Sequence, residues 1–131
     1  IVELANVGHT SHACLISEVG VQLEQACDVT QLPGFLQGWF IVQDEAPQLS
    51  AGLLQLEAGQ RVLDACAAPG GKTCHLLEAQ NVEVVAVELE QRRISRMEEN
   101  LQRMGLTAEI ICADASAPDH WWDGQLFDRI L

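Results

Sequence analysis

The chain has 131 residues, of which 48% are hydrophobic and 20% charged, and 7 Lys and Arg against 19 Asp and Glu give a formal net charge of −12. A chain of this length can bury the core of one domain, and no apolar run approaches the roughly 20 residues that a membrane-spanning helix needs. The composition therefore predicts a soluble globular protein without a membrane segment, and its acidic balance opposes nucleic-acid binding unless the basic residues gather on one face.

Residues 1–44 carry only a weak pattern of elements. The clearest expectation there is a helix around SHACLISEVG, residues 11–20. In residues 47–59, which follow, the leucines fall mostly on one helical face and Gly59 is suited to a left-handed cap. This second pattern predicts a short helix that ends at Gly59.

From residue 61 onward, strand-like and helix-like segments alternate regularly. Short apolar stretches predict the strands, and longer amphipathic stretches predict the helices. The predicted strands cover residues 61–67, 82–88, 108–115 and 127–131, and the predicted helices cover residues 70–80 and 91–105. This alternation is typical of parallel β-α-β units, in which ligands bind at the carboxyl ends of the strands.

The two ends of the sequence indicate a fragment. The chain begins with IVELANV, without an initiator Met or a signal-peptide pattern, and it stops at FDRIL inside a predicted strand. We therefore expect a piece of a longer protein. A parallel sheet cut after its fourth strand would expose an edge and an apolar face, so self-association through that edge is expected.

The cysteines indicate the redox environment. They form no CxxC pair and no zinc-ligand spacing, and their number is odd, which indicates reduced thiols in a cytoplasmic protein. Three histidines also share no metal-ligand spacing with them, so no metal site is predicted. The cysteines are Cys14, Cys27, Cys66, Cys74 and Cys112, and the histidines are His9, His12 and His120.

The stretch VLDACAAPGGKT, residues 62–73, falls on the loop between the first predicted strand of the alternation and its first helix. Its final Gly-Lys-Thr matches the last three positions of the phosphate-binding pattern GxxxxGK[ST]. However, Cys66 replaces the first glycine of that pattern, and Pro69 removes a backbone amide that a phosphate would need. These departures argue against nucleotide hydrolysis.

Acidic residues end the next two predicted strands. Glu88 lies 24 positions after Asp64, near the interval at which β-α-β nucleoside sites place an acid on the ribose hydroxyls. Asp114 ends the following strand, where a carboxylate can accept from the amine of an adenine. Because no cation cluster is present for a pyrophosphate, S-adenosylmethionine (SAM) is the favoured ligand. The alternative is that each acid only caps the helix after it.

These segments resemble the RNA cytosine-5 methyltransferases, and most closely their bacterial 16S ribosomal RNA branch, the Sun/Fmu family. The motif CAAPGGKT, residues 66–73, is rarely met outside that family. Three further segments resemble its motifs, so the likeness covers roughly residues 30–131: LPGFLQGWFIVQDEAPQLSAGLL, VVAVELEQRRISRMEENLQRMGL and ICADAS.

The resemblance implies an α/β fold in which residues 45–131 form part of a Rossmann-like methyltransferase domain with a mostly parallel sheet. Residues 1–44 would then be the remnant of a small α+β subdomain of RNA-binding type. In the family pattern Glu88 takes the ribose and Asp114 reaches the adenine. The full set of SAM-binding residues that the resemblance implies is Cys66, Ala67, Ala68, Pro69, Gly70, Gly71, Lys72, Glu88 and Asp114.

The implied reaction is methyl transfer from SAM to carbon 5 of a cytidine in 16S ribosomal RNA. Such enzymes need a cysteine that adds to carbon 6 of the base and a second cysteine that helps to expel the enzyme. Both belong to motifs that would follow FDRIL, and Cys66 belongs to the cofactor loop. We therefore predict no catalytic residue in this chain, no activity of the chain alone, and weak or absent RNA binding outside the longer protein.

A different class of function stays open on the residues alone. A module of the same fold without catalysis could bind a nucleoside or serve as a protein-interaction surface. Binding of SAM or its product is the property that separates these two classes.

Overall fold

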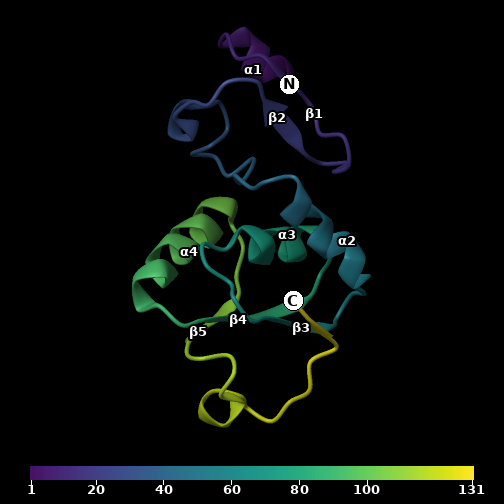
Figure 1. Ribbon diagram of the computed structural model, residues 1–131, viewed down its shortest axis with the longest axis vertical. Coiled ribbons are helices and arrows are strands. Elements are labelled where there is room, and N and C mark those ends of the chain that lie inside the picture. Colours follow the sequence, from purple (N-terminus) through teal and green to yellow (C-terminus); the bar gives the residue numbers. More distant parts are fainter.

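The computed structural model describes all of residues 1–131. At its centre is a four-stranded parallel sheet with the strand order β5-β4-β3-β6 (Figure 1). The alternation predicted from residue 61 onward is therefore confirmed. No helix is long and apolar enough to cross a membrane. The elements of this part are β3 (Arg61–Asp64), α3 (Gly71–Ala79), β4 (Glu83–Glu88), α4 (Gln91–Met104), β5 (Glu109–Cys112), η3 (Pro118–His120) and β6 (Arg129–Ile130).

The sheet is covered on both faces, which is why its central strands are almost continuously apolar. Successive strand residues point to opposite faces. Val62 and Ala86 point to one face, where they pack with Leu76 of α3 and Met97 of α4. Figure 1 shows these two helices on the same side of the sheet.

The other face of the sheet is covered by the connection between β5 and β6. Leu63, Val85 and Val87 point to this side and pack with Trp121 and Phe127 of the connection. Figure 1 shows the connection in yellow-green, on the side of the sheet away from α3 and α4. A loop and its two aromatic side chains thus complete the second half of the core.

Glycine ends α4 as predicted, but α2 (Ser50–Leu54) ends earlier than expected. Gly105 has a left-handed φ of 68° directly after α4. The left-handed residue that caps α2 is Gln55, with a φ of 48°, whereas the predicted cap Gly59, with a φ of 83°, lies beyond the end of the helix. The guanidinium of Arg129 donates to the carbonyls of Leu54 and Gln55 at 2.7 and 3.4 Å, which satisfies the end of the helix at this point.

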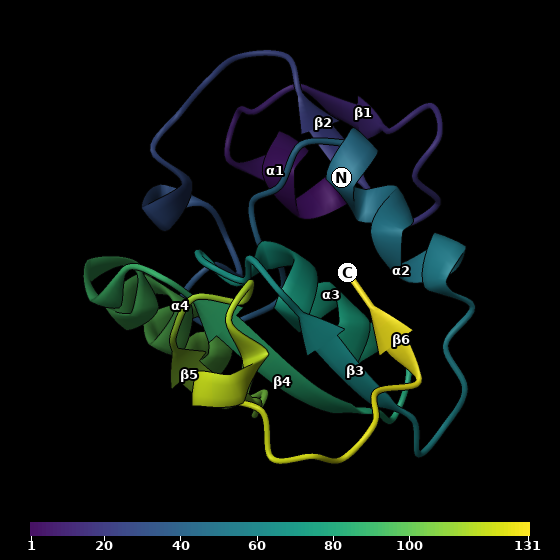
Figure 2. The ribbon, with the colours of Figure 1, turned by 60° about the horizontal axis from the view of Figure 1, so that its bottom comes forward.

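The amino-terminal residues form a small hairpin unit in which no strand or helix residue is buried. The helix predicted over residues 11–20 is wrong. Residues 11–13 pair with β2 instead, and the amides of Ile16 and Ser17 donate to the Glu45 carboxylate at 2.6 and 3.2 Å. Figure 2 shows β1 and β2 next to α1. The elements are α1 (Val2–Asn6), β1 (Ser11–Ala13), β2 (Val21–Leu23), η1 (Val29–Gln31) and η2 (Ala46–Leu49).

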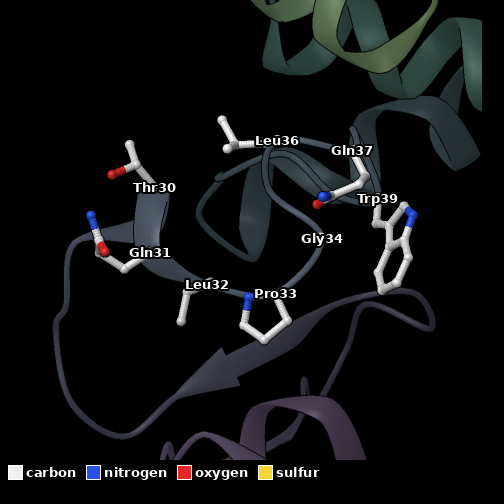
Figure 3. A pocket seen from close by; sticks show the side chains of 8 residues that line it. All are labelled: Thr30, Gln31, Leu32, Pro33, Gly34, Leu36, Gln37 and Trp39. Carbon is white, nitrogen blue, oxygen red and sulfur yellow. The ribbon is translucent and has the colours of Figure 1, made fainter.

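An open cavity of about 460 Å³ lies at and after η1 (Figure 3). Within it, Gly34 has a φ of 85° and lies against the indole of Trp39, so no side chain fits at this glycine. All of its lining residues are uncharged and none comes from the parallel sheet: Thr30, Gln31, Leu32, Pro33, Gly34, Leu36, Gln37 and Trp39.

The chain that follows this cavity packs on the carboxyl end of α4. Arg103 donates through Nη1 to the carbonyls of Phe35 and Phe40 at 2.8 and 2.9 Å, and its Cζ lies 4.1 Å from the centre of the Phe35 ring. Gly38 has a φ of 71°, and a Cβ atom there would overlap the carbonyl oxygen of Arg103. This contact joins the amino-terminal residues to the helical layer of the sheet.

Substituting Gly38 by Ala should therefore destabilise the chain by about 3 kcal/mol. A left-handed φ costs an L residue about 1 to 2 kcal/mol, and the overlap with the Arg103 carbonyl adds to that cost. Urea unfolding followed by circular dichroism measures the loss.

Gly124→Ala is the matched control, because Gly124 has a φ of 85° but no atom lies within 4 Å of the added methyl group. It should lose only about 1 to 2 kcal/mol. Equal losses for the two variants would show that the Gly38 contact with α4 is not tight.

Candidate functional site

The loop between β3 and α3, here called the glycine loop (residues 65–70), runs along the carboxyl ends of the strands. The amide of Ala67 donates to the carbonyl of Val87 at 3.1 Å, which holds the loop beside β4. The loop turns into α3 at Gly70, which has a φ of 94°. A Cβ atom at Gly70 would lie 3.0 Å from Cγ of Met97, so the turn sits directly on α4.

Five of the predicted binding residues belong to the glycine loop, and they differ in exposure. Ala67 and Ala68 are buried, with 4% and 6% of their surface exposed, and Gly70 is buried beside them. Cys66 and Pro69 are exposed. The buried Ala67 packs with Ala86 of β4 and Met97 of α4, so the loop is anchored in the core of the sheet.

Two further predicted binding residues, Gly71 and Lys72, begin α3 and are half-buried. The first helical hydrogen bond runs from the amide of Cys74 to the carbonyl of Gly70 at 2.8 Å. The amides of Gly71, Lys72 and Thr73 therefore have no partner within the helix. Together with the helix dipole, such amides favour a negatively charged group at this point.

Glu88 is the buried acid at the end of β4, with 2% of its surface exposed. Its Oε2 accepts from the amide of Ala68 at 3.2 Å, and its Oε1 accepts from the amide of Glu90 at 3.1 Å. Nη1 of Arg93 lies 3.1 Å from each carboxylate oxygen, and Nη2 donates to the carbonyl of Ala68 at 2.7 Å. Arg93 thus connects the acid to the glycine loop.

The charge of Glu88 is stabilised despite its burial. Burial by itself raises the pKa of Glu88, but the hydrogen bonds from the amides of Glu90 and Ala68 and the charge of Arg93 outweigh it, so the pKa lies below its ordinary value. The carboxylate is therefore ionised at neutral pH. Its two oxygens offer about four acceptor positions, of which the two amides and Arg93 occupy three, so one position remains for a further donor.

Asp64 is a second buried acid at this edge, with 2% of its surface exposed, and it is absent from the predicted binding set. Its Oδ2 accepts from the hydroxyl of Thr73 at 2.7 Å, which links the end of β3 to the start of α3. Burial raises its pKa, and the hydrogen bonds from Thr73 and the Cys66 amide and the charge of Lys72 oppose that rise. The sequence signal for Asp64 is a carboxylate directly before the glycine loop.

Asp114 lies beyond β5, next to the end of β4, where the amide of Ala113 donates to the carbonyl of Glu88 at 3.0 Å. Its side chain is exposed, and its Oδ1 accepts from the hydroxyl and amide of Ser116 at 2.7 and 2.9 Å. These two hydrogen bonds lower the pKa of Asp114. The two predicted acids thus share one edge of the sheet, but no hydrogen bond joins Asp114 to Glu88 or to the glycine loop.

Comparison with known proteins decides the family. The sequence model of the family described as 16S rRNA methyltransferase RsmB/F matches residues 51–131. The chain belongs to this family. The ribosomal RNA small subunit methyltransferases B of Pseudomonas syringae pv. tomato and Vibrio cholerae are 58% and 50% identical to it, over 98% and 100% of its length. The resemblance seen in the sequence is confirmed, and the chain spans 29% and 30% of these curated relatives.

Solved structures show the same fold. A methyltransferase homologue from Pyrococcus horikoshii has a TM-score of 0.79 at 25% identity, over 97% of this chain and 42% of that one. The structure of NSun6 from Pyrococcus horikoshii with SFG has a TM-score of 0.71 at 28% identity, over 85% of this chain and 30% of that one. The predicted α/β fold, part of the Rossmann-like fold of SAM-dependent methyltransferases, is thus confirmed.

Replacing Arg93 by Met should raise the pKa of Glu88, because it removes the cation 3.1 Å from both carboxylate oxygens. In the wild type, the lowered pKa gives a stabilisation that is complete above the ordinary value of about 4.3 and is lost as the pH falls through the folded value. In the variant, whose Glu88 has a higher pKa, this stabilisation is lost from a higher pH downward than in the wild type. Because the arginine is partly exposed, the loss of stability at neutral pH should be about 1 kcal/mol.

Urea unfolding at a series of acidic and neutral pH values measures this change. Arg92→Met is the matched control, since the Arg92 side chain is 83% exposed and pairs only with Glu90. The control should keep the wild-type dependence on pH. The same shift in both variants would mean that Arg93 does not act through Glu88.

Proposed function

We propose that this chain is the SAM-binding part of a ribosomal RNA cytosine-5 methyltransferase. The observation that carries the proposal is the buried, ionised carboxylate of Glu88 beside the glycine loop, in a chain of the RsmB/F family. Ligands of open parallel sheets bind at the carboxyl ends of the strands, which is where Glu88 and the glycine loop meet.

The residues at this edge fit the chemical groups of SAM. The ionised Glu88 can accept from one ribose hydroxyl at its remaining acceptor position, and the amides of Gly71 and Lys72 suit the methionine carboxylate. Asp64 and Glu88 favour a cationic ligand over a polyphosphate. Oδ2 of Asp114, which has no hydrogen bond, remains available to an adenine amine. When bound, SAM supplies an electrophilic methyl group.

For the whole protein we propose methyl transfer to carbon 5 of a cytidine in 16S ribosomal RNA, in the cytoplasm. The chain spans about 30% of its curated relatives, whose names specify ribosomal RNA of the small subunit. Chemistry on a paired base requires that the base first leave the stack. Methyl transfer by this route also needs the two cysteines of the family pattern, and none of the five cysteines here matches their motifs.

We also propose that RNA is held mainly by the rest of the protein. The chain has a formal net charge of −12. Five of its seven basic residues donate to carboxylates or carbonyls of the chain itself, namely Arg61, Arg92, Arg93, Arg103 and Arg129. Few cations therefore remain for phosphates.

The proposed division into residues 1–44 and 45–131 is supported by burial and by the family match. No helix or strand residue before residue 32 is buried, whereas the family model begins at residue 51. Self-association through the edge of the sheet stays a prediction. One edge of the sheet is formed by β6, which is only two residues long, and its Ile130 is 61% exposed.

Calorimetry with S-adenosylhomocysteine tests the proposal. The wild type should bind, and Glu88→Gln should bind about 10 to 100 times more weakly, because hydrogen bonds to a charged acceptor contribute about 1.5 to 3 kcal/mol. Glu90→Gln is the matched control, since its carboxylate accepts only from Arg92. Circular dichroism first establishes that each variant is folded. A folded wild type that gives no binding heat would favour the interaction module.

Asp114→Asn tests the adenine assignment separately. The amide oxygen of Asn can keep the turn with Ser116, while its NH2 group replaces Oδ2 and faces the adenine amine as a second donor. We expect binding of S-adenosylhomocysteine to weaken about tenfold, at unchanged thermal stability. Unchanged affinity would remove Asp114 from the site.

A further inference from the structure

Two neighbouring side chains of α4 connect the glycine loop to the chain upstream of the sheet. Nδ2 of Asn100 donates to the carbonyl of Pro69 at 2.9 Å, and Oδ1 of Asn100 accepts from Nη2 of Arg103 at 3.3 Å. Arg103 in turn donates to the carbonyls of Phe35 and Phe40 at 2.8 and 2.9 Å. Asn100 and Arg103, here called the α4 bridge, thus form a continuous line of hydrogen bonds.

The guanidinium of Arg103 has no carboxylate partner. Although the chain carries 19 Asp and Glu, this guanidinium meets only carbonyls, the Asn100 amide and the face of the Phe35 ring. A guanidinium holds several acceptors in a fixed planar geometry, whereas the three donors of a lysine lie on a single rotatable nitrogen. The contact therefore fixes a backbone geometry rather than neutralising a charge.

The segment held in this way leads to the start of α3. Downstream of Phe40, the side-chain amide of Gln43 lies 3.6 Å from the position of a Cβ atom at Gly71. Gln48 holds the backbone there, because its Nε2 donates to the carbonyl of Gln43 at 3.2 Å. The upstream segment (residues 34–43) is thus fixed at the α4 bridge and again next to the first residue of α3.

We propose that Asn100 and Arg103 are positioning residues of the SAM pocket. The α4 bridge sets the distance between the glycine loop and the upstream segment, so that Gln43 forms a wall of the pocket at the start of α3. Neither bridge residue needs to touch the cofactor. This inference rests on the proposed SAM-binding function.

Two variants separate the ends of the α4 bridge. In Asn100→Asp the remaining carboxylate oxygen still accepts from Arg103, but the donor to the Pro69 carbonyl is replaced by an acceptor. In Arg103→Met the carbonyls of Phe35 and Phe40 lose their donor, and Asn100 loses the partner that orients its amide toward the Pro69 carbonyl. The matched controls are Gln102→Glu, an exposed position of α4 with the same change of charge, and Arg96→Met, an exposed arginine of α4 that makes no hydrogen bond or ion pair.

Hydrogen exchange of the ligand-free chain tests the α4 bridge without any cofactor. The reporting amides are those of Gly38, which donates to Phe35, and of Gly70, which donates to Ala67. Arg103→Met should speed exchange at both amides about tenfold, and Asn100→Asp should do so mainly at Gly70. Both control variants should exchange as the wild type does. Normal exchange at Gly70 in Arg103→Met would overturn the proposal.

Calorimetry with S-adenosylhomocysteine then tests the pocket. Each bridge variant should bind about 5 to 10 times more weakly than its control, and Arg103→Lys should recover part of the affinity. Wild-type affinity in both bridge variants would overturn the positioning role. If the wild type itself gives no heat, the proposed function fails, and changed exchange would then support only the bridge between the two segments.

Discussion

A carboxylate that is removed from water must be compensated by the protein, and the compensation of Glu88 organises this edge of the sheet. Its donors come from the glycine loop, from the junction after β4 and from the first turns of α4. One negative charge therefore fixes the relative positions of three segments. Arg93 strengthens this arrangement because it also donates to the carbonyl of Ala68.

The two buried acids at this edge differ in their hydrogen-bond partners and in the direction of their pKa shifts. Glu88 contacts a guanidinium and two amides, and its pKa is lowered against the effect of burial. Asp64 has no cation in hydrogen-bond contact, and burial raises its pKa. Glu88 thus ends β4 with a paired charge, and Asp64 joins the end of β3 to the start of α3 through Thr73.

The sequence was informative wherever the deciding contacts are local. The apolar strands, the amphipathic α4 and its Gly105 cap were predicted because periodicity and φ preference act over a few residues. Where distant residues decide, the prediction was wrong. Residues 11–20 form a hairpin whose turn donates to Glu45, and α2 ends early because Arg129 reaches its carbonyls.

The same distinction applies to the site. Glu88 and Asp114 were found by their place after apolar strands, and the structure brings both to one edge. Arg93 was missed because a cation in the first turn of a helix opposes the helix dipole and resembles a solvent-facing residue. Asp114 does not cap a helix as the alternative would require, since its side chain closes a turn with Ser116.

The position of Lys72 has a practical consequence for anyone who studies this chain in solution. It is the only lysine, and it begins the helix that follows the glycine loop. Apart from the terminal amine, an amine-reactive dye can therefore attach at one place only. Fluorescence from a label on Lys72 would report on the first turn of α3, without the need to engineer a unique cysteine into a chain that already has five.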